Sequence, residues 1–149
     1  MTSQHMATDQ DTLLAGQIIL IAEGGDLDQG IALQAAHLAA TAGCPLTVAL
    51  LVIPPWSLAF EPVAAYLFDD GEAELSALTL LTRALESVPV QWRLNIVTGA
   101  PTRTIAQLGS EHQTLFLAAD GRRRWGMLRR PARIARSAAR RNGFGVVLL

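Results

Sequence analysis

Residues 114–149 read TLFLAADGRRRWGMLRRPARIARSAARRNGFGVVLL, and this stretch decides the fold. It begins with the short apolar run Thr114–Ala119, which Asp120-Gly121 breaks. Pro131 can begin a helix, and Gly143–Leu149 returns as a second apolar run. The pattern predicts a strand, a helix and a second strand. In a parallel sheet the turn after a strand lies at the carboxyl ends of the strands, where ligands bind, so the Gly121 turn is the first place to look for function.

Three earlier segments also have the character of strands. Gln17–Ala22 is continuously apolar, as expected for a central strand covered on both faces, and Glu23 follows it. Leu46–Ile53 predicts a second buried strand. Val90–Val97 alternates apolar and polar residues, which is typical of a strand at the edge of a sheet.

Helices are expected between these strands. Asp26 and Asp28 can cap the first helix, which Gly43 ends, and its apolar positions at helical spacing are Leu27, Ile31, Ala35, Leu38 and Ala42. Asp69-Asp70 open a second helix to about Ser87, with an expected inward stripe of Leu75, Leu78, Leu81, Leu85 and Val88. Pro101 stands at the first position of a third helix, in which Ile105, Leu108 and Ala106 face inward.

The strict alternation of strands and helices favours a parallel sheet with helices on both faces. Residues 1–15 are interpreted as a disordered N-terminal tail and residues 16–149 as one α/β domain. The segment Trp56–Phe68 mixes aromatic residues and prolines without a clear period. We interpret it as a packed excursion in preference to a lid that contacts a ligand.

Composition narrows the class of protein. Half of the 149 residues are apolar, which is enough to bury a core without cross-links. Cys44 has no partner for an internal disulfide and no metal-ligand spacing occurs, so we expect a cytoplasmic location, with neither a signal peptide nor a membrane span. His37, His112 and the serines fall on separate elements without a nucleophile elbow. An enzyme is therefore not expected.

Together these features resemble the universal stress protein family. The resemblance spans about residues 17–149 and rests on short segments at matching places: Ile21-Ala22-Glu23-Gly24-Gly25, Ala32-Leu33, Leu50-Leu51-Val52 and Gly99-Ala100-Pro101 before Ile105. It implies a Rossmann-like α/β fold with a five-stranded parallel sheet in the order 3-2-1-4-5. It also implies a pocket at the switch point between the first and fourth strands, framed by Glu23, Val52 and the Gly121 turn.

Nucleotide-binding members of that family carry a phosphate motif that this sequence alters. Their first strand ends in aspartate, and their fourth is followed by glycine, two residues, glycine, nine residues, then glycine and serine or threonine. Ala118 and Gly121 stand at the first two glycines here. Pro131 and Ala132 stand at the final pair, and Glu23 replaces the aspartate. Because the glycine amides and the hydroxyl donate to phosphate oxygens, we expect an impaired ATP pocket and no bound cofactor.

The alternative is a nucleotide or anion site of different chemistry, with a slow ATPase activity. Arg122-Arg123-Arg124 and Arg129-Arg130 flank the same turn, and their guanidinium groups can hold phosphate. In that case ATP would be the ligand, and the residues expected around it are Ala22, Glu23, Val52, Ala118, Gly121, Arg122, Arg123, Arg124, Arg130, Pro131 and Ala132.

The charges are distributed unevenly along the chain. Residues 1–120 hold all 13 acidic residues and three arginines, whereas residues 121–149 hold nine arginines and no acid. On the last helix one basic face is formed by Arg129, Arg133, Arg136 and Arg140, while Ile134, Ala135, Ala138 and Ala139 are left to pack. The favoured interpretation of this face is that it is solvated or paired with acidic groups. The second interpretation is an anion-binding site. Nucleic acid is the least favoured partner, because the protein is slightly acidic overall and no aromatic residues are interleaved.

The sequence thus predicts a small cytoplasmic regulatory domain of universal stress protein type, which works through a protein partner that the sequence does not identify. The apolar segment Gly145–Leu149 needs cover if it forms an edge strand. The family resemblance implies that this strand pairs with its counterpart across a dimer axis, so we expect a homodimer.

Overall fold

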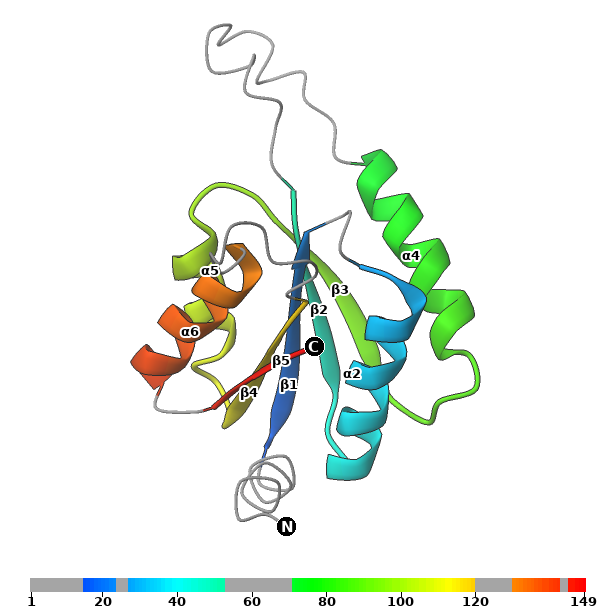
Figure 1. Ribbon diagram of the computed structural model, residues 1–149, viewed down its shortest axis with the longest axis horizontal. Coiled ribbons are helices and arrows are strands. Elements are labelled where there is room, and N and C mark those ends of the chain that lie inside the picture. Colours follow the sequence, from blue (N-terminus) through cyan, green and yellow to red (C-terminus); the bar gives the residue numbers. More distant parts are fainter. Residues whose placement is uncertain (1–14, 24–26, 53–70, 120–129, 143–144) are drawn as a thin grey trace, which may run out of the picture.

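The fold is given by a computed structural model that describes residues 15–23, 27–52, 71–119, 130–142 and 145–149. Strands and helices alternate along the chain (Figure 1) in the order β1 (Gln17–Glu23), α2 (Gln29–Ala42), β2 (Leu46–Leu51), α4 (Gly71–Leu85), β3 (Trp92–Val97), α5 (Pro101–Leu108), β4 (Thr114–Ala118), α6 (Arg130–Asn142) and β5 (Val146–Leu148). Several predicted features lie outside the described residues: the tail up to residue 14, Asp26, the segment Trp56–Phe68, the Asp69-Asp70 pair, the Gly121 turn and Arg129 of the basic face.

The strands form one five-stranded sheet in the order β3-β2-β1-β4-β5, and every neighbouring pair is parallel. Helices α2 and α4 cover one face, and α5 and α6 cover the other (Figure 1). The predicted fold class and strand order are therefore confirmed. Val90–Val97 was expected at an edge, and β3 is indeed an edge strand.

Strand β1 lies at the centre of the sheet and of the core. Every residue from Gln17 to Ala22 is buried, because helices cover the strand from both sides. Alternate side chains divide between the two layers: Ile18 and Leu20 pack toward α2 and α4, whereas Ile19 and Ile21 pack toward α5 and α6. The continuous apolar run predicted this double burial.

Helix α2 contacts the sheet through small side chains. Its N-cap residue Asp28 accepts a hydrogen bond from the backbone N–H of Ile31 at 2.8 Å, and Gly43 ends the helix in the left-handed conformation with φ of 68°. Of the predicted inward positions, Leu27 and Ala35 are buried, whereas the larger Ile31 and Leu38 are only partly buried where they pack against the core. The fully buried helical residues are alanines: Ala32, Ala35, Ala36 and Ala39.

Helix α4 is rotated from its predicted orientation. Leu81, Leu85 and Val88 are buried as expected, but Leu75 is 66% exposed and Leu78 is 36% exposed. The inward positions are completed by Ala77 and Ala84. The buried face is displaced by roughly 60° around the helix axis from the leucine stripe. The prediction was wrong here because it gave leucines priority over alanines, whereas small residues let α4 lie close to the sheet and to α2.

The opposite layer follows its prediction closely. Pro101 begins α5 after Gly99, whose φ of 75° suits glycine, and Ile105 and Ala106 are buried while Leu108 is partly so. Helix α6 buries the predicted apolar positions, Ile134, Ala135, Ala138 and Ala139, together with Ala132.

A buried polar cluster connects the amino ends of β1 and β4. The Gln17 side-chain amide donates to the Thr114 hydroxyl at 2.8 Å and to the Leu108 carbonyl at 2.9 Å. The Thr114 hydroxyl donates in turn to the carbonyl of Gly109 at 3.0 Å. Nearby, Ala15 is already buried, although residue 15 was assigned to the tail. This cluster ties β1, β4 and the end of α5 together.

Candidate functional site at the carboxyl edge of the sheet

Three predicted site residues meet where parallel strands end. Glu23 ends β1, Val52 directly follows β2 and Ala118 ends β4. Strands β1 and β4 are joined here by a hydrogen bond from the Ala119 N–H to the Ile21 carbonyl at 3.0 Å. After β1 the chain enters α2 on one face, whereas α6, the helix after β4, lies on the other. The junction of β1 and β4 is therefore the switch point at which ligands bind in open α/β sheets.

The side chains at this edge offer little polar chemistry. Ala22 and Ala118 are fully buried, and Val52 is partly exposed and apolar. Glu23 is partly exposed, and its backbone carbonyl accepts from the N–H of Leu27 at 3.2 Å. Among the described residues of this edge, Glu23 and Arg130 supply the charged groups.

The start of α6 is packed against the sheet. Pro131 is buried and has no N–H, and the fully buried Ala132 lies in the same apolar cluster as Ile21 and Ala118. Arg130 is partly exposed beside them. The side chain of Ala132 thus contributes packing at the place where the family pattern has a hydroxyl. The predicted site residues Gly121, Arg122, Arg123 and Arg124 lie outside the described residues.

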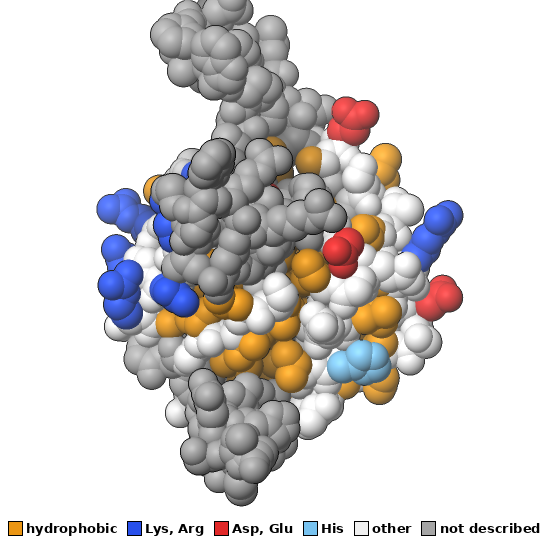
Figure 2. Space-filling view, in the orientation of Figure 1, with side chains coloured by type: hydrophobic (Ala, Val, Ile, Leu, Met, Phe, Trp, Pro, Cys, Tyr) orange, Lys and Arg blue, Asp and Glu red, His pale blue; other side chains and the backbone are white. Residues whose placement is uncertain are grey.

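A basic surface covers the outside of α5 and α6. Arg133, Arg136 and Arg140 are exposed as predicted, and Arg103 on α5 adds a charge that the sequence analysis did not include. Neither helix contains an acidic residue, and these arginines form no ion pair within the described ranges. Figure 2 shows blue side chains gathered on this side, whereas the red side chains visible in this view lie on the opposite side.

A groove between α2 and α4 was missed by sequence reasoning. It has a volume of about 540 Å³ and is lined by Gln29, Leu75, Ser76, Thr79, Leu80 and Arg83. The sequence feature that indicates the groove is the pair of alanines at positions 77 and 84, which are buried on the inner side of α4. With those alanines turned inward, Leu75 faces outward toward the groove.

Other chemistries find little support in the described part of the chain. No cluster of metal-ligating side chains occurs there, and no helix in it is long and apolar enough to cross a membrane. His37 and His112 are exposed. Burial raises the pKa of the Cys44 thiol, which keeps it protonated at neutral pH and poorly nucleophilic.

The sheet order and the helices on both faces define the class of doubly wound α/β proteins. No protein-family model matches the sequence, and no curated protein matches it. Among solved structures, the universal stress protein from Archaeoglobus fulgidus aligns over 89% of this chain and 92% of its own, with a TM-score of 0.53 and 15% identity.

Two further structures are similar over most of the chain. A universal stress protein in complex with cAMP covers 91% of this chain and 97% of its own, with a TM-score of 0.49 and 21% identity. A protein from the universal stress protein family from Burkholderia pseudomallei covers 89% and 94%, with a TM-score of 0.43 and 22% identity. The likeness to the archaeal structure shows that this chain has the universal stress protein fold.

Proposed function

We propose that this chain is a cytoplasmic regulatory domain of universal stress protein type, that it is not an enzyme, and that its ATP pocket is impaired. The observation that carries the proposal is the start of α6. There Pro131 and Ala132 are buried in the positions at which the family pattern places a glycine amide and a hydroxyl. Regulation then depends on contacts with another protein.

The size of the expected loss follows from hydrogen-bond energies. Proline removes a backbone donor and alanine removes a hydroxyl. A hydrogen bond to a charged phosphate contributes about 1.5–3 kcal/mol, so the loss of two weakens binding on the order of a hundredfold or more.

Thermal melting with increasing magnesium-ATP tests this proposal. The wild-type chain is expected to show no change in Tm at millimolar ATP, because a ligand raises Tm only when its concentration exceeds Kd. The variant Ala118→Gly/Pro131→Gly/Ala132→Ser restores the family pattern, and its Tm is expected to rise with ATP. A control variant, Ala138→Ser, adds a hydroxyl in the middle of α6 and is expected to show no ATP response. A concentration-dependent rise in the wild-type Tm would contradict the impaired pocket.

A second candidate function is nucleotide or anion binding by an arginine clamp, with a slow ATPase activity. It is favoured by the basic first turn of α6, where Arg130 and Arg133 stand near the positive end of the helix dipole and no acid occurs on the helix. In this case the wild-type Tm rises with ATP, and the rise disappears in the variant Arg122→Ala/Arg123→Ala/Arg124→Ala. Release of phosphate from ATP then separates an ATPase from a binder.

We also propose that the chain forms a homodimer through β5. This strand is apolar and only partly buried, and it lies at an edge of the sheet. Its inner side is paired with β4, as in the bond from the Leu149 N–H to the Ala118 carbonyl at 2.9 Å. An uncovered apolar edge strand favours association. Light scattering at micromolar concentration is expected to give the mass of a dimer, and a monomer would contradict the proposal.

A further inference from the structure

A second, more apolar chamber adjoins the groove between α2 and α4. The chamber has a volume of about 270 Å³ and is lined by Leu27, Leu50, Ala73, Ser76, Ala77 and Leu80. Ser76 and Leu80 line both spaces, so the two cavities adjoin. Leu50 belongs to β2 and is 1% exposed, so the inner end of the chamber reaches the core of the protein.

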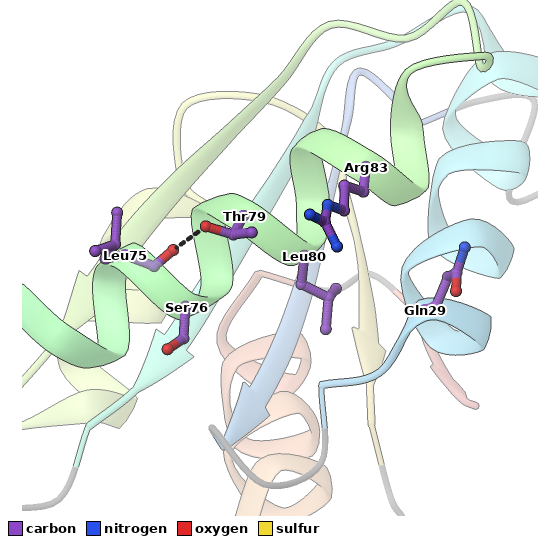
Figure 3. A pocket seen from close by; sticks show the side chains of 6 residues that line it. All are labelled: Gln29, Leu75, Ser76, Thr79, Leu80 and Arg83. Atoms are coloured by element: carbon purple, nitrogen blue, oxygen red, sulfur yellow. Dashed lines mark hydrogen bonds between the residues drawn. The ribbon is translucent and has the colours of Figure 1, made fainter.

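The described lining of the groove combines two leucines with four polar side chains, of which Arg83 carries a positive charge. Arg83 makes no hydrogen bond or ion pair within the described part of the chain, and no acidic residue is among the groove-lining residues. Thr79 is already engaged, because its hydroxyl donates to the Leu75 carbonyl at 2.9 Å. Figure 3 shows Leu80 extending from α4 into the space between α4 and α2, the Arg83 side chain lying along α4 above it, and Gln29 projecting from α2.

We propose that this groove binds an amphipathic carboxylate, such as a medium-chain fatty acid. The apolar body occupies the chamber beside Leu50 and Ala77, and the carboxylate binds the guanidinium of Arg83. An apolar cavity with a few polar groups at one end is the usual form of a small-molecule site, and the volume of the groove lies in the range of such sites. A carboxylate matches the planar fork of arginine.

The same features argue against a nucleotide as the occupant. Among the described residues that line it, the chamber offers one hydroxyl and otherwise apolar side chains, which cannot replace the water around a phosphate chain. The groove belongs to the α2 and α4 layer, whereas α6, which follows the junction of β1 and β4, lies on the other face of the sheet.

Isothermal titration with decanoate below its micelle concentration tests the proposal, with decanol as the uncharged probe. The wild-type chain is expected to bind decanoate saturably at a one-to-one ratio and decanol more weakly. Arg83→Gln is expected to weaken decanoate binding about tenfold or more and to leave decanol binding unchanged, because only the carboxylate bond is lost. Ala73→Leu narrows the chamber and is expected to weaken both probes.

Arg136→Gln on α6 is the matched control, since it removes the same charge from the other layer. Equal weakening by Arg136→Gln and Arg83→Gln would overturn the proposal, as would equal affinity for decanoate and decanol. Failure of decanoate to bind the wild-type chain would also overturn it. Amide chemical shifts that change on α6 rather than on α4 would place the ligand elsewhere. Binding of a leucine-rich acidic peptide that decanoate does not displace would assign the groove to a protein partner instead.

Discussion

The two helix layers on this sheet are built from similar materials but present different surfaces. Both α2 and α6 approach the sheet through alanines, which bring helix and sheet close together. Outside, α5 and α6 carry arginines and no acid, whereas the α2 and α4 layer carries charges of both signs, exposed leucines and a groove. What each helix layer can bind is therefore determined by its outward-facing residues and not by how its inner side packs on the sheet.

The comparison predicts that the α4 leucines differ sharply in their contribution to stability. Leu81→Ala is expected to lower the free energy of unfolding by about 2–5 kcal/mol, because Leu81 is fully buried and its removal leaves a cavity. Leu75→Ala removes the same atoms from an exposed site and is expected to change stability by less than about 0.5 kcal/mol. Urea unfolding of both variants measures the difference. Equal losses would mean that α4 faces the sheet as the leucine stripe predicted.

A smaller effect is expected at the helix starts, where the layers also differ. Asp28→Ala removes the side-chain cap of α2 and is expected to cost about 1 kcal/mol. The N-cap residue of α5 is Ala100, which has no side-chain oxygen to cap the helix, so Ala100→Asp is expected to add stability, by up to about 1 kcal/mol. Thermal unfolding should therefore shift in opposite directions for the two variants. A loss in both would show that the start of α5 does not accept a cap.

The smallest effect concerns the basic surface. Arg136 stands three residues after Arg133 and four before Arg140, so Arg136→Gln relieves two like-charge contacts. Stability is expected to rise by about 0.2–0.5 kcal/mol at low salt, and the gain should vanish at high salt, where charges are screened. Arg83→Gln, on the layer with mixed charges, should show no such salt-dependent gain. Destabilisation by Arg136→Gln at low salt would indicate that an acidic group pairs with it.

The sequence predicted the strands better than the exposed helix faces. Buried parallel strands are continuous apolar runs, so Gln17–Ala22 identified the central strand, and Glu23, Val52 and Ala118 could be placed together because parallel strands end at one edge. The orientation of α4 could not be predicted from its leucines, because contact with α2 favours alanines on the inner side. The groove depends on that orientation. It is lined by residues of two helices, whereas the hydrophobic periodicity of a sequence describes each helix separately.

The buried cluster of Gln17, Thr114 and the Leu108 carbonyl has a consequence for motion within the domain. It fixes β1, β4 and the end of α5 at the amino rim, far from the strand ends where Glu23 and Ala118 lie. Breaking this cluster would leave buried polar groups without hydrogen-bond partners, at a cost of about 1–3 kcal/mol for each group. Local opening of the domain should therefore be smallest at the amino rim and largest at the carboxyl rim. Amide hydrogen exchange is expected to be fastest at the carboxyl rim.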